Sequence, residues 1–242
     1  MKKITTLLAL GAVSGGLVWS QPTALAATKT PTVKKATAKK VTTKKKVTSK
    51  KKAHKKTAKH HYIFIMGHGA GDPGARGSGT TEATYLRKHL MPKLKKYAKH
   101  VKKSTVTFYN PSHNIVRDTL VFHKGSYKIS KKNTTVIMFH LDASTSSRAH
   151  GGHVIIHKSR PNARDTRIRS VIKKYVGLNP ANNGYSYRTN LRNCNVLRHR
   201  GVDHDLIETG FITNRTDYRH INQHLDKIAK GYVAAITNEK IK

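Results

Sequence analysis

From residue 62 onward, short apolar runs alternate with longer stretches in which apolar residues recur at helical spacing. Runs rich in β-branched and aromatic residues predict strands at residues 62–66, 104–109, 134–139, 152–157 and 205–208. Helical periods predict helices at residues 82–98, 162–176 and 221–236. Strands that alternate with helices predict a single α/β domain, in which helices on both faces flank a mainly parallel or mixed central sheet.

Three local features refine this pattern. Thr81 is placed to cap the helix at 82–98, whereas Pro92 inside that helix predicts a kink or a break. The run at 134–139 is of the kind that is buried on both faces of a sheet. Residues 112–132 and 178–200 show neither the helical nor the strand pattern of apolar residues. We expect an irregular loop in the first range and a polar, Asn-rich connection in the second.

Residues 1–26 resemble a secretory signal peptide. Lys2 and Lys3 precede an apolar stretch, and residues 24–26 (Ala-Leu-Ala) provide the small residues of a cleavage site. A membrane anchor is the alternative, but the apolar stretch is rich in Gly and shorter than the ~20 residues that span a bilayer. We therefore expect cleavage, a secreted product and no transmembrane span after cleavage.

Residues 27–61 consist mainly of Lys, Thr, Ala, Val and Ser and contain no acidic residue. Little apolar surface and strong self-repulsion predict a disordered tail. The chain has a formal net charge of +37, and residues 62–242 are also strongly basic. Such an excess suggests a polyanionic partner. For a secreted chain we expect anionic wall polymers such as teichoic acid, with no specific nucleic acid; a solvated spacer is the alternative role of the tail.

Four side chains form a pattern that is typical of a zinc hydrolase. His68 lies between two glycines, Glu82 begins a predicted helix, His140 follows an apolar strand and Glu208 ends another. Because sites of α/β sheets gather outside the carboxyl ends of strands, His68, His140 and Glu208 are expected to converge. Two imidazoles and one carboxylate leave Zn²⁺ one open position for water, and a further carboxylate can act as base and acid.

Each of these residues also has an ordinary interpretation when it is taken alone. His68 could be a surface histidine in a glycine turn, and Glu82 could be an acid favoured at a helix start. His140 could be a hydrogen-bonded structural histidine. Glu208 is more informative, because a buried carboxylate in a chain with only 11 acidic residues needs a nearby cation.

The other candidate side chains are not assigned to a metal. The chain has 16 histidines, most of which must be surface groups; His150 and His153 flank a glycine turn and could line the cleft. Cys194 is the only cysteine, so an intramolecular disulfide is excluded. No Cys-His signature surrounds it, and we expect a structural, partly buried thiol.

Several motifs occur together along residues 62–240. They are residues 62–69 (YIFIMGHG), 72–75 (DPGA), Glu82, 139–143 (FHLDA), 151–154 (GGHV) and 208–214 (ETGFITN). This set resembles zinc-dependent N-acetylmuramoyl-L-alanine amidases, and is closer to the versions in phage endolysins and Gram-positive autolysins than to the periplasmic division amidases. The resemblance implies that His68, Glu82 and His140 bind zinc and that Glu208 is the catalytic carboxylate.

Departures from the family pattern concern substrate contacts rather than the metal site. Many members have Asn at the position of Asp142, Leu at that of Thr209, and Arg where this chain has residues 110–111 (Asn-Pro). Asp142 could orient a ligand or bind substrate. Arg188 and Asn190 could hold the carboxylates or muramoyl oxygens of the substrate, although ordinary loop residues would look the same.

The resemblance implies a function for residues 62–242, the expected zinc amidase domain. This function is cleavage of the amide bond between N-acetylmuramic acid and the L-alanine of the peptidoglycan stem peptide, in cell-wall remodelling or autolysis. Two alternatives stay open: a zinc peptidase that cuts within the stem peptide, and a non-catalytic basic wall-binding protein on the same scaffold. Together with the signal and the tail, each predicts a secreted protein associated with a Gram-positive wall.

Overall fold

The computed structural model describes residues 58–157 and 160–242. The predicted signal peptide, residues 1–26, and residues 27–57 of the predicted tail lie outside the described residues. The last residue of the predicted tail, His61, belongs instead to a strand of the central sheet, where it pairs with Thr105 and Thr134. In the described part of the chain, no helix has both the length and the apolar character needed to cross a membrane.

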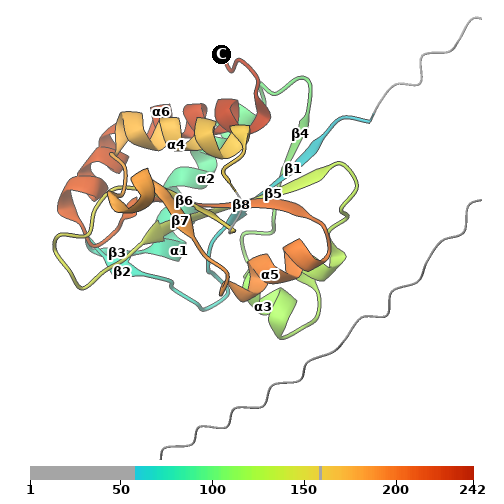
Figure 1. The fold of residues 1–242 in the computed structure, drawn as a ribbon, viewed down its shortest axis with the longest axis horizontal. Coiled ribbons are helices and arrows are strands. Elements are labelled where there is room, and N and C mark those ends of the chain that lie inside the picture. Colours follow the sequence, from blue (N-terminus) through green and yellow to red (C-terminus); the bar gives the residue numbers. More distant parts are fainter. Residues whose placement is uncertain (1–57, 158–159) are drawn as a thin grey trace, which may run out of the picture. The chain divides into compact units, whose positions relative to one another are not determined.

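A mixed sheet of six strands forms the centre of the described domain, in the order β4-β1-β5-β8-β6-β7 (Figure 1). Its neighbouring strands pair in parallel except for β6 and β8, which are antiparallel. A separate ribbon pairs β2 (Arg76–Gly77) with β3 (Thr80–Thr81). The six strands are β1 (His61–Met66), β4 (Thr105–Phe108), β5 (Thr134–Asp142), β6 (His153–Ile156), β7 (Tyr185–Tyr187) and β8 (Asp203–Phe211).

Helices cover both faces of this sheet, as the alternating pattern predicts. Figure 1 shows α2, α4 and α6 on one face and α3 and α5 on the other. The α-helices are α1 (Glu82–Tyr85), α2 (Met91–Ala98), α3 (Ile115–Leu120), α4 (Ala163–Tyr175), α5 (Arg192–His199) and α6 (Arg215–Thr237). A π-helical segment (Leu86–Leu90) joins α1 to α2, and short 3-10 turns occupy Gly125–Lys128 and Ala181–Asn183. The predicted α/β architecture is confirmed.

The central strands are buried on both faces. In β5, Ile137 and Phe139 belong to the larger apolar cluster with α2, α4 and α6, whereas Val136 and Met138 belong to a second cluster with α5. Successive side chains of a strand point to opposite faces, so a continuous apolar run supplies both layers at once. The predicted burial of the run at 134–139 is confirmed.

Two strands extend beyond their predicted ends. Both β5 and β8 are nine residues long and continue to Asp142 and Phe211. His140 and Glu208 therefore lie inside the carboxyl-terminal parts of these strands, where we had expected His140 just past the end of one and Glu208 as the last residue of the other. The register pairs His140 with Glu208, and polar residues can continue the ladder here because the strands border a cavity.

The helix that was expected to kink or break at Pro92 is not broken there, since residues 82–98 are helical throughout. The regular α pattern is interrupted before the proline, in the π-helical segment, where the Met91 N–H donates to the Leu86 carbonyl. Pro92 then occupies the first turn of α2, where a missing N–H is tolerated. Thr81 caps α1 as predicted, because its side chain accepts a hydrogen bond from the Thr84 N–H.

Two segments that we expected to be irregular contain regular elements. Residues 112–132 include α3, whose N-cap Asn114 accepts hydrogen bonds from the backbone N–H groups of Val116 and Arg117. Residues 178–200 include β7 and α5. These elements span only three to eight residues. Such lengths are too short for a hydrophobic period to show in the sequence.

Candidate active site

The four predicted site residues meet at the edge of the sheet formed by the carboxyl ends of β1, β5 and β8. These three strands are neighbours and run in parallel. His68 follows β1 by two residues, His140 lies in β5 and Glu208 lies beside it in β8. Glu82 is the first residue of α1, which begins after the Gly-rich loop. The expected convergence of His68, His140 and Glu208 is therefore present in the fold.

The carboxylate of Glu82 lies between the two imidazole rings. His140 Nδ1 is 2.8 Å from Glu82 Oε1, and His68 Nε2 is 3.1 Å from Glu82 Oε2. One donor atom from each residue lies within 4.8 Å of the others. Among the described residues, no other three His, Cys, Asp or Glu side chains gather in this way. Two imidazoles and one carboxylate are a donor set that could hold a zinc ion.

Glu82 is held rigidly, since it is only 2% exposed and accepts two backbone hydrogen bonds. Its Oε1 accepts from the Leu141 N–H at 3.0 Å and its Oε2 from the Ala75 N–H at 3.1 Å. Burial alone would raise the pKa of Glu82, but the hydrogen bonds and charges of His140 and His68 outweigh it and hold this pKa well below its usual range. The carboxylate is therefore ionised and able to bind a cation.

Burial lowers the pKa of His68, but the hydrogen bonds and charges of Glu82 and Asp72 reverse this effect and raise it to about 9. A histidine must be neutral at the nitrogen that binds a metal. A metal ion that binds here therefore displaces a proton from His68.

Asp72 orients the ring of His68. Its Oδ2 accepts a hydrogen bond from His68 Nδ1 at 2.8 Å, which leaves Nε2 pointing at Glu82. Asp72 is itself fixed by the Gly74 N–H at 2.9 Å and by Asn114 Nδ2 at 3.1 Å. A carboxylate behind a metal-binding histidine fixes its tautomer and strengthens it as a ligand. The sequence shows only an acid four residues after His68, which by itself does not reveal this role.

Gly74 leaves the space that this arrangement needs. It has a φ of +64°, and a Cβ built on it would lie 2.5 Å from the His68 ring and 2.7 Å from Glu82 Oε2. Gly71, in the same loop, also has a positive φ, +91°, but a Cβ there would meet no atom within 4 Å. Both glycines have a positive φ, but only at Gly74 would a Cβ collide with the proposed ligands.

We expect Gly74→Ala to weaken metal binding by about 10-fold or more, because the methyl group must push His68 and Glu82 apart. Gly71→Ala is the matched control, since it introduces backbone strain without a collision. Competition with a zinc chelator measures the affinity of each variant. Equal affinities for the two variants would show that the space at Gly74 is not needed.

Glu208 lies beside this group, in surroundings that disfavour its ionised form. Its side chain is partly exposed, but Oε2 is enclosed and has no hydrogen-bond partner among the described residues. Burial raises the pKa of Glu208 well above its usual range, the charges of Glu82 and Asp142 raise it further, and Arg188 opposes them. Leaving a carboxylate oxygen enclosed and unpaired is costly. A dication next to it would remove that cost and lower the pKa again.

A cavity of about 420 Å³ opens beside these residues. His68, His140 and Glu208 line it together with apolar residues of the sheet, α3 and α5. Arg188 and Asn190 lie at the same cavity, so the structure places both near the proposed metal site. Asp142 lies instead in an adjoining cavity of about 190 Å³, together with His153 and Arg188. The sequence did not reveal the apolar wall, because α3 and α5 were not predicted.

The histidines and the cysteine that we did not assign to a metal lie outside the three-residue group. His153 is buried, and its Nε2 is 3.7 Å from Asp142 Oδ2. His150 is exposed and contacts the carbonyl of Arg148. Cys194 is a buried free thiol, and burial raises its pKa to about 11. A thiol that stays protonated at neutral pH is a poor nucleophile, which agrees with a structural role.

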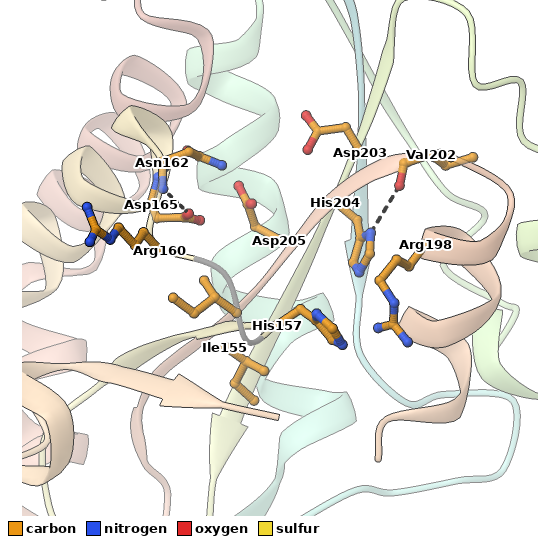
Figure 2. A pocket seen from close by; sticks show the side chains of 12 residues that line it. Ile155, His157, Arg160, Asn162, Asp165, Arg198, Val202, Asp203, His204 and Asp205 are labelled. Atoms are coloured by element: carbon orange, nitrogen blue, oxygen red, sulfur yellow. Dashed lines mark hydrogen bonds between the residues drawn. The ribbon is translucent and has the colours of Figure 1, made fainter. Parts of the chain in front are cut away.

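A second cavity, of about 410 Å³, opens at the opposite edge of the sheet, where β6 ends and β8 begins (Figure 2). Asp165 and Asp205 line it and are only 2% and 3% exposed. Arg164 donates to both oxygens of Asp205, at 2.5 and 3.0 Å. Asp165 accepts from the Asn162 N–H at 2.7 Å, as Figure 2 shows, which completes a capping box at the start of α4.

Burial and the negative charge of Asp205 raise the pKa of Asp165 to about 7. The usual pKa of this group is 3.8. Between pH 3.8 and about 7, the folded state therefore keeps a proton that the unfolded state has released. The stability from this proton is fully present below pH 3.8 and is lost as the pH rises to about 7. We expect Asp165→Asn to remove this dependence, so its Tm relative to the unmodified protein should rise by ~3 °C between pH 5 and pH 8. Calorimetry measures the Tm of both proteins at each pH. A Tm difference between them that does not change from pH 5 to pH 8 would contradict this prediction.

Comparisons with known proteins agree with the site. The chain matches the N-acetylmuramoyl-L-alanine amidase family over residues 63–238. It is 34% identical over 191 residues to "Probable autolysin PH" of Staphylococcus aureus, which covers 74% of this chain and 38% of that protein. The chain thus spans well under half the length of this relative.

Two solved structures share the fold. The catalytic domain of the CD27L endolysin targeting Clostridia difficile superposes with a TM-score of 0.58 at 20% identity, over 76% of this chain and 99% of that one. An N-acetylmuramoyl-L-alanine amidase from Clostridium difficile superposes with a TM-score of 0.55 at 20% identity, over 75% of this chain and 97% of that one. At these identities the likeness concerns the fold alone.

Proposed function

Because this chain belongs to the N-acetylmuramoyl-L-alanine amidase family, we propose that it is a zinc-dependent peptidoglycan hydrolase. The bond it cleaves is the amide between N-acetylmuramic acid and the L-alanine of the stem peptide. One observation carries the proposal: donor atoms of His68, Glu82 and His140 lie within 4.8 Å of one another. The register then places Glu208 beside His140.

The residues at the site fit a zinc ion. His68, Glu82 and His140 would hold it, and the unpaired oxygen of Glu208 supports a cation close by. When bound, zinc supplies Lewis acidity that polarises the amide carbonyl and makes water a stronger nucleophile at neutral pH. Asp72 keeps the ring of His68 in the orientation that the ion needs.

Glu208 is the proposed general base and acid. It accepts the proton of the attacking water and then donates it to the nitrogen of the leaving alanine. Burial raises the pKa of Glu208, which makes its carboxylate a stronger base, and a cation beside it would favour the ionised form that accepts the proton. Glu208 is not among the three residues whose donor atoms converge, which leaves it free for this role.

Polar groups around the cavity would bind the substrate. Arg188 and Asn190 line the 420 Å³ cavity and can contact carboxylates of the stem peptide or oxygens of the muramoyl group. Asp142 and Arg188 line the smaller cavity next to it and can contact a further part of the substrate. The apolar wall formed with α3 and α5 suits methyl groups of the lactyl and acetyl substituents.

The remaining proposals concern where the enzyme acts. Residues 1–26 would direct export, and residues 27–61 would hold the enzyme to anionic polymers of a Gram-positive wall through their lysines. The printed name of the Staphylococcus aureus relative, an autolysin, supports a role in cell-wall remodelling or autolysis.

The proposal is tested with purified cell walls and the chain from residue 28 onward. New amino-terminal alanine should appear on incubation, without new reducing sugar ends. Chelator should stop the release, and added zinc should restore it. New amino termini other than alanine would indicate a peptidase, and new reducing ends would indicate a glycosidase; either result would reject the proposed reaction.

A further inference from the structure

The guanidinium group of Arg87 is surrounded by backbone carbonyls of the loop that carries His68. Arg87 lies in the π-helical segment and is half-buried. Its Nη1 donates to the Gly67 carbonyl at 2.7 Å, and its Nη2 donates to the carbonyls of His68 at 2.7 Å and Met66 at 3.2 Å. Three successive carbonyl groups therefore point at one side chain.

The same side chain also holds a second loop and its own helix. Arg87 Nε donates to the Pro111 carbonyl at 2.7 Å, and its Nη2 donates to the His113 carbonyl at 3.3 Å. Its Nη1 also lies 3.3 Å from the carbonyl of Ala83, one residue after Glu82. Arg87 thus ties the end of β1, the start of α1 and the loop before α3 to one another.

Arginine is suited to this position because its planar group carries five N–H donors in a fixed arrangement. Carbonyl oxygens that converge on one point repel one another unless a donor or a cation lies between them. A lysine has three donors on a flexible stem and could not meet carbonyls of three segments at once.

The backbone of the His68 loop needs such support. His68 has a φ of +58° and Ala70 a φ of +52°, in the left-handed region that residues with a Cβ avoid. Strained conformations of this kind persist only when the surroundings enforce them. Between them Gly69 has a φ of +98°, and a Cβ there would lie 2.2 Å from Arg87 Nη2. The loop is therefore shaped around the guanidinium group.

We propose that Arg87 is a positioning residue for the metal site: it holds the backbone of residues 66–68 so that His68 Nε2 faces Glu82. This inference rests on the proposed zinc site. Arg87 binds the backbone carbonyl of His68, which is a proposed ligand. A change at Arg87 should therefore alter metal affinity and turnover, whereas a change at a residue that only stabilises the fold should not.

Arg200 offers a matched control. It is also half-buried, and its Nη1 donates to the backbone carbonyls of Ser126 and Ile129 in a segment that contains no proposed ligand. Arg87→Lys and Arg200→Lys should each lower the Tm, since each loses hydrogen bonds to carbonyls. Only Arg87→Lys should change the metal site.

The experiment measures zinc affinity by chelator competition, kcat, KM and the Tm with and without zinc, for the unmodified protein and both variants. We expect Arg87→Lys to bind zinc about 10- to 100-fold more weakly. Its kcat should fall while KM stays near the unmodified value, and Arg200→Lys should keep the zinc affinity of the unmodified protein.

Two results would overturn the role of Arg87. One is an Arg87→Lys variant that loses Tm like Arg200→Lys but binds zinc and turns over normally. The other is an Arg87→Lys variant that does not fold even in saturating zinc, which would make Arg87 a structural residue. Failure of the unmodified protein to bind zinc is a separate result, because it would reject the proposed metal site itself.

Discussion

Glu208→Gln should lower kcat by roughly 10²- to 10⁴-fold while zinc stays bound at one ion per chain. Glutamine has nearly the same shape as glutamate but cannot accept a proton from water or return it to the leaving amine. Glu208 is not among the three residues whose donor atoms converge, so its replacement leaves the proposed ligand set intact. This variant should therefore lose turnover and keep its zinc.

Glu239→Gln provides the control for this prediction. Glu239 accepts hydrogen bonds from the backbone N–H groups of residues 102–104, just before β4. Its replacement changes a glutamate away from the carboxyl ends of the strands and should leave both kcat and zinc content unchanged. Metal analysis and release of amino-terminal alanine are measured on both variants. Near-normal turnover by Glu208→Gln would remove Glu208 from the mechanism.

Glu82→Gln should have the second large effect, and here zinc and turnover should be lost together. The Glu82 carboxylate contacts both imidazoles and accepts two backbone hydrogen bonds at a buried position. The amide removes the negative charge and turns a donor toward groups that are themselves donors, such as the N–H of Leu141 or Ala75. We expect zinc affinity to fall by more than the ~10- to 100-fold that is typical when only a supporting residue of a metal site is changed.

The same substitution should also destabilise the zinc-free protein, since a buried donor left without a partner costs about 1–3 kcal/mol. Metal content after dialysis and calorimetry of the zinc-free protein measure the two effects. Glu208→Gln serves as the control, because it should keep its metal. A Glu82→Gln variant that retains one zinc ion per chain would show that Glu82 is not a ligand.

Much of the site could be predicted from the sequence because its residues follow strong local patterns. His68 and His140 follow apolar runs that predict strands, and Glu208 ends a third such run. Parallel strands in one sheet bring their carboxyl ends to one edge, so residues far apart in the chain were expected to meet. The exact ends of β5 and β8 could not be predicted, because polar residues continue these strands beside a cavity.

The parts that were missed depend on contacts across the fold. Arg87 acts on backbone carbonyls, which every residue possesses and which leave no signal in a sequence. The apolar wall of the cavity comes from α3 and α5, which span six and eight residues. Asn114 both caps α3 and donates to Asp72. In the sequence it cannot be distinguished from other polar loop residues, because both roles depend on the fold.

The central claim is that this site cleaves the bond between muramic acid and L-alanine. Mass spectrometry of the fragments released from purified cell walls tests it most directly, with zinc and with chelator. The account predicts zinc-dependent release of intact stem peptides that begin with L-alanine, and glycan strands that keep their lactyl groups. Zinc-dependent cuts within the peptides would contradict the claim and favour a peptidase. No release by a zinc-loaded protein would contradict it as well and favour a non-catalytic wall-binding scaffold.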